Sequence, residues 1–380
     1  MMNKETLCAL GEGESPYESA VSPPIFQTST FGGGGDFSYT RCSNPTRSAL
    51  EREIAVLEGG KYGFAFSSGL GAINAVFSLL QSGDHVIVSD DLYGGTYRLI
   101  TRIYEKYGID FEFTDMTDPE NVALAVKNET ALVFAESPTN PMMKIIPLRE
   151  IAGICKSKGI IFAVDNTFLT PYFQNPLTLG ADLVIHSATK FLSGHHDTIS
   201  GAIVTNDDSL AEELSMISMT LGNMLSPFES WLVLRGIRTL PLRMEKHQEN
   251  SIKVAEFLET LPEIEAVIYP ALDSHSGKEL CLSQSSGFGG VVSFTVRDVK
   301  YAKRLINGGR IIKFAESLGG FRSLITYPVT QTHASVPKEK RERLGINDRL
   351  LRLSVGLENI EDIKSDILHT LHNDSLDKTT

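Results

Sequence analysis

Residues 62–89 read YGFAFSSGLGAINAVFSLLQSGDHVIVS, and this stretch contains the repeating unit of the fold. A short apolar run, Tyr62–Phe66, is followed by a glycine-rich turn and by an apolar stretch of helical length, Gly71–Gln81. A second short apolar run, His85–Ser89, comes next. Strands that are apolar on both faces and alternate with helices are typical of a parallel sheet covered on both sides. The stretch therefore predicts an α/β fold.

The same alternation continues for about 100 residues further along the chain. The expected strands are Ile109–Phe113, Ala131–Ala135, Ile160–Val164 and Asp182–Ser187, and the expected helices are Thr96–Tyr107 and Leu148–Lys158. After about residue 230 the pattern changes. A long helical stretch (Glu229–Leu261), strands near Gly290–Val296 and a final helix near Ile360–Leu371 indicate a smaller α+β unit.

The segment before residue 44 has no regular apolar period, and a helix then begins sharply. Asn44 is suited to cap its N-terminus, Pro45 suits its first turn, and Gly59 can end it in a left-handed conformation. We therefore predict three parts, with the following boundaries: an N-terminal arm (1–43), a large α/β domain (44–235) and a C-terminal α+β domain (236–380).

Composition excludes several classes of protein. The chain has 380 residues, of which 42% are hydrophobic and 22% charged, as in ordinary globular proteins. Its net charge of -12 argues against nucleic acid as a partner. The four cysteines form no metal or redox pair, which favours reduced thiols and a cytoplasmic location. We expect neither a secretory signal nor a membrane span, because no apolar run approaches the required length.

Ionisable residues follow several of the predicted strands at the edge where such sheets bind ligands. Asp165 and Lys190 each come directly after a strand. A lysine there can form a Schiff base with an aldehyde cofactor, and pyridoxal phosphate (PLP) also needs an acid that keeps its pyridine nitrogen protonated. Ser187 and Thr189 flank the lysine with hydroxyls that suit a phosphate. The sequence therefore predicts a PLP site.

The turn at residues 67–71 has two interpretations. Its small residues and the helix that follows suit an anion such as a phosphate. Alternatively, Gly69 and Gly71 begin a dinucleotide-binding G-x-G-x-x-G pattern, with Asp90 at a suitable distance. Asn74 occupies the position of the third glycine, so this pattern is incomplete. A dinucleotide-dependent oxidoreductase remains the alternative from another class.

Three further candidates come from other parts of the chain. Tyr93 follows a strand in a glycine-containing loop, where its ring could stack on a flat cofactor. Tyr39 and Arg41 in the arm could bind a phosphate, including one in a neighbouring subunit. Arg352 lies on an expected strand and could anchor a carboxylate. For the adjacent pair His195 and His196 we predict no metal, because neighbouring side chains on an extended segment point apart.

Taken together, the chain resembles the Cys/Met-metabolism family of PLP enzymes, which includes cystathionine γ-synthase, cystathionine γ- and β-lyases and methionine γ-lyase. The matching blocks are YTR (39–41), NPTR (44–47), SSGLGAI (67–73), DLYGGTYR (91–98), ESPTNP (136–141), VDNTF (164–168), HSATK (186–190), ESLGG (316–320), THASVP (332–337) and RLSVGLE (352–358).

The resemblance implies a fold type I subunit, similar to aspartate aminotransferase, with a mainly parallel seven-stranded sheet. It also implies homotetramers built from tight dimers that share their active sites. Lys190 would be the Schiff-base lysine and Asp165 the partner of the ring nitrogen, and Tyr93 would stack on the ring and act in acid–base chemistry. The implied phosphate and cofactor contacts are Ser68, Gly69, Leu70, Thr167, Ser187 and Thr189, with Tyr39 and Arg41 from the neighbouring subunit. The implied substrate contacts are Arg352, Asn140, Ser317 and Glu316.

Two positions bear on the reaction. Glu316 before Ser317 resembles the γ-synthases and γ-lyases, and Gly95 stands where methionine γ-lyases carry a cysteine. The resemblance therefore favours a C–S lyase that cleaves cystathionine-type substrates by α,γ-elimination. The alternatives are a cystathionine γ-synthase, acting by γ-replacement on an O-acylhomoserine, and a cystathionine β-lyase.

Overall fold

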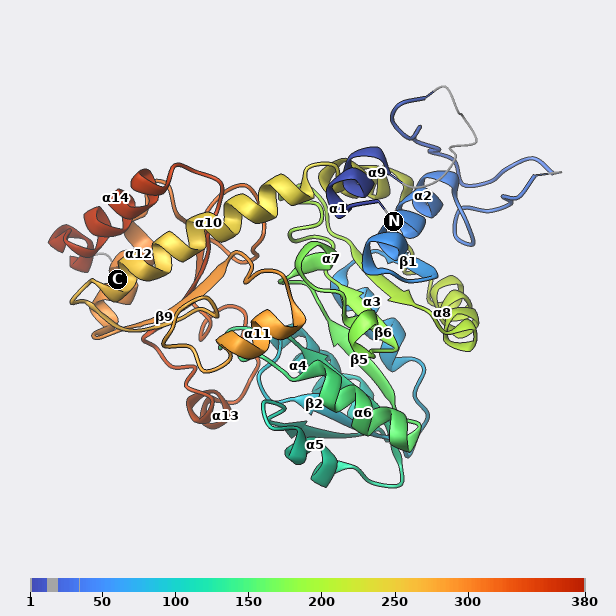
Figure 1. The fold of residues 1–380 in the computed structure, drawn as a ribbon, viewed down its shortest axis with the longest axis horizontal. Coiled ribbons are helices and arrows are strands. Elements are labelled where there is room, and N and C mark those ends of the chain that lie inside the picture. The colour runs from blue at the N-terminus through green and yellow to red at the C-terminus, as the bar shows by residue number, and fades with distance from the viewer. Residues whose placement is uncertain (1, 12–19, 34, 379–380) are drawn as a thin grey trace.

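The structure is a computed structural model that describes residues 2–11, 20–33 and 35–378. The expected N-terminal arm therefore lies partly outside the described residues. Its described part after residue 20 extends away from the body of the molecule (Figure 1).

Within the described ranges, seven strands form the larger sheet in the order β1-β7-β6-β5-β4-β2-β3. Its strands are β1 (Tyr62–Phe66), β2 (His85–Ser89), β3 (Asp110–Thr114), β4 (Thr130–Glu136), β5 (Ile161–Asp165), β6 (Leu183–His186) and β7 (Gly201–Thr205). β7 runs antiparallel to both of its neighbours, and the other neighbouring strands are parallel. The mainly parallel seven-stranded sheet is therefore confirmed.

Helices cover both faces of this sheet because successive strand side chains point to opposite sides. In β2, Val86 and Val88 pack in one core cluster and Ile87 in another. One face carries α3 (Gly69–Phe77), α4 (Gly94–Arg102) and α8 (Asp208–Leu221), and the other carries α2 (Pro45–Glu58), α5 (Pro119–Ala125) and α6 (Leu148–Lys158). The remaining elements of this part are α1 (Lys4–Leu10), α7 (Thr170–Phe173), α9 (Pro227–Ile237), η1 (Tyr104–Tyr107) and η2 (Pro176–Leu179).

A second sheet has the order β10-β11-β12-β9-β8 among the described residues. Its strands are β8 (Ile264–Ile268), β9 (Val291–Val296), β10 (Lys313–Phe314), β11 (Leu324–Thr326) and β12 (Leu350–Ser354). It packs through one core cluster against α10 (Leu240–Glu259), α12 (Val299–Gly308) and α14 (Ile360–Leu371). The remaining elements are α11 (Lys278–Gln284), α13 (Lys338–Arg343) and η3 (Asp374–Lys378). Figure 1 shows α10 running from the larger sheet to the smaller one.

Two expectations about helices were wrong. The stretch Glu229–Leu261 is two helices, α9 and α10, with Pro241 in the first turn of the second. Proline lacks the N–H that a continuous helix would need, so the chain turns just before it. The arm also contains the short helix α1, whose Cys8 is buried in the core. Among the described residues, we found no helix long and apolar enough to cross a membrane.

Candidate functional site

A cavity of about 640 Å³ lies at the carboxyl ends of the parallel strands, where the second sheet closes it. The larger sheet contributes the segments after β1, β2, β4, β5 and β6, and the second sheet contributes Arg352. The sequence-predicted residues that line it are Ser68, Gly69, Leu70, Tyr93, Asn140, Asp165, Thr167, Ser187, Thr189, Lys190, Glu316, Ser317 and Arg352. The fold therefore brings together all of the predicted site residues except Tyr39 and Arg41.

Lys190 presents its amine to this cavity from the turn after β6. Its Nζ donates a hydrogen bond to Ser317 Oγ at 2.8 Å. Burial and then the positive charge of Arg352 lower the pKa of Lys190 to about 8, although Glu316 acts in the opposite sense. A larger fraction of this amine is therefore neutral near pH 7 than for a surface lysine, and a neutral amine can act as a nucleophile or a base.

Asp165 is the last residue of β5 and only 8% of it is exposed. Its Oδ1 accepts hydrogen bonds from the backbone N–H of Thr167 at 3.0 Å and from the Thr167 hydroxyl at 2.5 Å. Burial raises the pKa of Asp165, whereas the bonds from Thr167 and the charge of His186 oppose that shift. The carboxylate is thus held in one orientation with hydrogen bonds that favour its ionised form.

Glu136 is a site residue to which the sequence analysis assigned no role. It ends β4, pairs in register with Asp165 and lines the cavity. Its Oε2 accepts a hydrogen bond from the backbone N–H of Tyr93 at 3.0 Å. Burial and then the negative charge of Asp165 raise the pKa of Glu136 well above its usual value. The sequence feature that could have identified Glu136 as a site residue is its position at the end of a buried strand.

Of the side chains that the structure describes, Arg352 is the largest that is fully buried, with 1% of its surface exposed. Its guanidinium donates to Asn140 Oδ1 at 2.8 Å, to the Ser317 carbonyl at 3.0 Å and to Thr326 Oγ1 at 3.1 Å. Its Nε has no hydrogen-bond partner within the described part of the chain. Burial lowers the pKa of Arg352 to about 10, so it remains a cation, and its Nε–H is still available, as an anchor for a carboxylate requires.

The turn after β1 forms a small cradle at the N-terminus of α3. Ser68 Oγ accepts from the backbone N–H of Gly71 at 2.9 Å and caps the helix. A Cβ on Gly69 would lie 2.7 Å from Ser187 Cβ, so only glycine fits between the turn and the strand. The Thr189 hydroxyl is already bonded to the backbone of Ser200, at 3.0 Å as donor and 2.8 Å as acceptor. The N-terminus of a helix suits an anion, because its first N–H groups have no partner within the helix.

Tyr93 precedes α4 and is 38% exposed. Its ring lies over Gly95, where a Cβ would come within 2.3 Å of the ring. A residue of the C-terminal part also contacts this loop: His333 Nε2 lies 3.1 Å from the Leu92 carbonyl oxygen. A side chain at position 95 would therefore displace the Tyr93 ring.

Tyr39 and Arg41 do not line the cavity of their own chain. Tyr39 is 45% exposed, and the Arg41 guanidinium lies 5.5 Å from the centre of its ring. Arg41 Nη1 donates to the Met219 carbonyl at 3.1 Å. Both side chains are accessible on the extended arm, and their contribution to a neighbouring subunit's cavity stays a prediction.

The structure also bears on two other motifs. Asp90, the residue required by the dinucleotide alternative, forms an ion pair with Lys144 at 3.0 Å. No group of three or more His, Cys, Asp or Glu residues placed to hold a metal occurs in the described ranges. His196, which has a φ of 57°, instead lines the cavity, as do Phe168 and Thr332. Phe168 and Thr332 belong to the matching blocks VDNTF (164–168) and THASVP (332–337), but the sequence analysis assigned them no role.

Comparisons with known proteins agree on one family. The model of the family described as "Cys/Met metabolism PLP-dependent enzyme" matches residues 5–372. Cystathionine beta-lyase of Lactococcus lactis subsp. cremoris is 49% identical over 93% of this chain and 94% of its own length. Cystathionine gamma-lyase of Bacillus subtilis is 46% identical over 98% of this chain and 100% of its own. The crystal structure of cystathionine gamma synthase from Xanthomonas oryzae pv. oryzae superposes with a TM-score of 0.95, at 39% identity and 100% coverage of both chains.

Proposed function

Because this chain belongs to the family of Cys/Met metabolism PLP-dependent enzymes, we propose that it is a C–S lyase that cleaves cystathionine-type substrates by α,γ-elimination. The observation that carries the proposal is the Lys190 amine, which lies 2.8 Å from Ser317 Oγ inside a cavity that the Arg352 guanidinium closes. One buried base and one buried carboxylate anchor are the groups that such a reaction on an amino acid requires.

The residues of the cavity fit PLP. A reactive amine (Lys190), an oriented carboxylate (Asp165) and a glycine-lined helix start (Gly69) surround the space. Both described hydrogen bonds to the Asp165 carboxylate end on Oδ1, which leaves Oδ2 for the ring nitrogen. Lys190 would bind the aldehyde and Tyr93 would cover the ring. The proposed phosphate and cofactor contacts are Ser68, Leu70, Thr167, Ser187 and Thr189, joined by Tyr39 and Arg41 of a second subunit.

When bound, PLP stabilises the negative charge that develops on substrate carbons. Arg352, with Asn140 and Ser317, holds the substrate carboxylate and thereby fixes its Cα near Lys190. Lys190 removes the proton from Cα, and in a γ-elimination it also removes one from Cβ. Its lowered pKa of about 8 makes the neutral, basic form accessible near neutrality.

Tyr93 is the second acid–base group in this proposal, and it can protonate the departing sulfur. Glu316 neighbours Ser317 on the cavity wall and completes the substrate-binding set. The Glu136 contact to the Tyr93 backbone fixes the loop from which the phenol acts.

Two alternatives share the same machinery. A β-lyase would release sulfur from Cβ after a single proton removal, and the name of the Lactococcus relative favours it. A γ-synthase would add a thiol at Cγ of an O-acylhomoserine, and the name of the Xanthomonas structure favours that. The dinucleotide-dependent oxidoreductase is not supported, because the family is PLP-dependent.

Incubation of the PLP-loaded protein with cystathionine separates these routes. Gamma-cleavage yields cysteine and 2-oxobutyrate, whereas β-cleavage yields homocysteine and pyruvate, and mass spectrometry of the keto acid identifies the route. A second incubation with an O-acylhomoserine and cysteine measures synthase activity. Pyruvate as the sole keto acid would overturn the γ assignment. Lys190→Ala is the matched control and should abolish turnover and the visible absorbance of the bound cofactor.

We further propose that the chain works as a cytoplasmic homotetramer of tight dimers, with an arm (1–43), a cofactor domain (44–235) and a C-terminal domain (236–380). Support for shared sites comes from the exposed Tyr39 and Arg41 on the extended arm. Support for the cytoplasm comes from Cys8, Cys42, Cys155 and Cys281, all of which are free thiols.

A further inference from the structure

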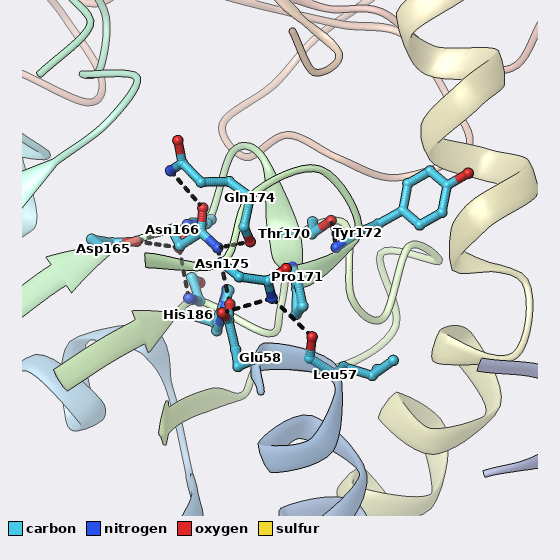
Figure 2. Close-up of polar contacts among 12 residues, drawn as sticks. Leu57, Glu58, Asp165, Asn166, Thr170, Pro171, Tyr172, Gln174, Asn175 and His186 are labelled. Atoms are coloured by element: carbon cyan, nitrogen blue, oxygen red, sulfur yellow. Dashed lines mark hydrogen bonds and ion pairs between the residues drawn. The ribbon is translucent and has the colours of Figure 1, made fainter. Parts of the chain in front are cut away.

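A largely buried polar cluster begins at Asn166, the residue that follows Asp165. We call it the Glu58 cluster, and it comprises Glu58, Asn166, Gln174, Asn175 and His186 (Figure 2). Glu58, Asn166 and His186 are each 0% exposed, and none of the five residues lines the cavity. The proposed mechanism uses none of them, so their polarity needs another reason.

One carboxylate joins the ends of two strands in this cluster. Glu58 Oε1 accepts from Asn166 Nδ2 at 2.9 Å and lies 2.6 Å from His186 Nε2. Asn166 directly follows Asp165, and His186 directly precedes Ser187. Through these two contacts, Glu58 at the end of α2 fixes the residue that follows Asp165 and the residue that precedes Ser187.

The far side of the cluster reaches the N-terminal helix. Asn175 Nδ2 donates to Glu58 Oε2 at 3.2 Å, and Lys4 Nζ of α1 hydrogen-bonds Asn175 Oδ1 and the Pro171 carbonyl. The charged or titratable groups in and around the cluster are therefore Glu58 from α2, Asp165 from β5, His186 from β6 and Lys4 from α1.

Charge balance indicates what His186 does. Two carboxylates, Glu58 and Asp165, are both buried in this part of the molecule, and an uncompensated buried carboxylate is costly. A protonated pyridine ring would balance only one of them. His186 Nε2 is in direct contact with Glu58, and a positive charge on the His186 ring would also favour ionised Asp165. His186 Nδ1 has no hydrogen-bond partner within the described part of the chain.

We propose that His186, held by Glu58, is a positioning residue for the cofactor: its doubly protonated ring keeps Asp165 ionised, and Asp165 thereby keeps the proton on the pyridine nitrogen. This inference rests on the proposed role of Asp165. It assigns a purpose to a buried ion pair that touches neither cofactor nor substrate.

The test follows the ring nitrogen directly. The holoenzyme is reconstituted with PLP labelled with ¹⁵N in the ring, and the ¹⁵N chemical shift is recorded against pH. We expect a protonated nitrogen across the accessible range in the unmodified protein. In His186→Gln and in Glu58→Gln, the pKa of the ring nitrogen should fall by about one unit or more and into the accessible range, which is a tenfold or greater decrease in the ratio of protonated to unprotonated nitrogen at a given pH. An unchanged titration in folded His186→Gln would overturn the proposal.

Lys4→Met is the matched control, because it breaks the same network at its far end and leaves the Glu58–His186 contact intact. It should lower thermal stability without moving the ¹⁵N signal, which separates a positioning role from a structural one. If the substituted proteins fail to fold, ¹⁵N-histidine spectra of the unmodified holoenzyme decide instead. A His186 ring with a single proton would contradict the proposal.

Asp165→Asn distinguishes this inference from the proposed function. If the ring nitrogen depends on Asp165 but not on His186, only the present inference fails. If it depends on neither residue, the proposed role of Asp165 fails as well.

Discussion

The chemistry of a single lysine in this protein depends on what surrounds its amine. Burial lowers the pKa of Lys190 to about 8, and Arg352 acts in the same sense. For Lys144, burial again acts to lower the pKa, but the carboxylates of Asp90 and Asp115 raise it above its usual value. The same residue type is therefore a base at one position and a permanent cation at the other.

This difference predicts a pH dependence for cofactor uptake. Only the neutral Lys190 amine attacks the aldehyde, so the rate of PLP capture by the apoenzyme should rise about tenfold per pH unit below the pKa of about 8 and level off above it. Stopped-flow absorbance measures the rate. In Arg352→Met the midpoint should move to higher pH, because a neighbouring positive charge is lost. A wild-type rate that still climbs steeply at pH 10 would contradict the prediction.

Glu136 offers a test of whether a carboxyl with a raised pKa acts without its charge. Because its pKa is raised well above the usual value, Glu136→Gln keeps both the working neutral state and an acceptor for the Tyr93 N–H, and activity should stay within about twofold. Glu136→Ala removes the acceptor and should reduce kcat/KM by roughly 5- to 100-fold. Steady-state kinetics compare the two, and equal losses in both variants would show that the charge itself is needed.

Gly95 tests the placement of the Tyr93 ring. A Cβ at this position would lie 2.3 Å from the ring, so Gly95→Ala should shift the ring, alter the visible spectrum of the bound cofactor and lower kcat. Gly153→Ala is the control, because nothing lies within 4 Å of a Cβ there. An unaltered cofactor spectrum in Gly95→Ala would mean that Tyr93 does not cover the ring.

At the scale of secondary-structure elements, helix ends were the most predictable feature. Asn44 accepts from the Thr46 N–H at 3.0 Å, Pro45 occupies the first turn, and Gly59 ends α2 with a φ of 72°. These residues act through local geometry that needs no distant partner. The break between α9 and α10 follows the same local rule, because Pro241 lies in the first turn of α10. The apolar pattern continues across this proline, and the sequence analysis therefore expected a single helix.

The cap of α2 should matter more than an ordinary cap. Asn44 is 0% exposed and also donates from Nδ2 to the Phe26 carbonyl at 2.9 Å, which ties the arm to the helix. Asn44→Ala should lower the free energy of unfolding by about 1–3 kcal/mol. Asp118→Ala removes the exposed cap of α5 and should cost about 1 kcal/mol or less. Urea unfolding of the apoproteins measures both, and equal losses would refute the added role of burial.

At the scale of the whole molecule, the position of the arm predicts that subunits complement one another. Arm variants (Tyr39→Phe with Arg41→Ala) and Lys190→Ala should each be inactive. If the arm completes a neighbour's site, mixing and reassembling the two proteins creates some sites with an intact arm and an intact lysine. Activity of the mixture should then recover to about a quarter of wild type, assuming random pairing into two-site dimers. Complete absence of recovery in verified mixed assemblies would place Tyr39 and Arg41 in their own chain's site.

Much of this molecule follows from local sequence. Alternating apolar runs, caps and glycines determine the α/β class, because each acts within a few residues. The strand-end positions of Asp165 and Lys190 predict their proximity, since parallel strands end at one edge. Tertiary structure alone decided the rest. The raised pKa of Glu136, the Arg352 Nε that has no partner among the described residues and the burial of His186 against Glu58 each depend on residues far away in the chain. Their chemistry arises from burial and charge in three dimensions, which no spacing along the chain encodes.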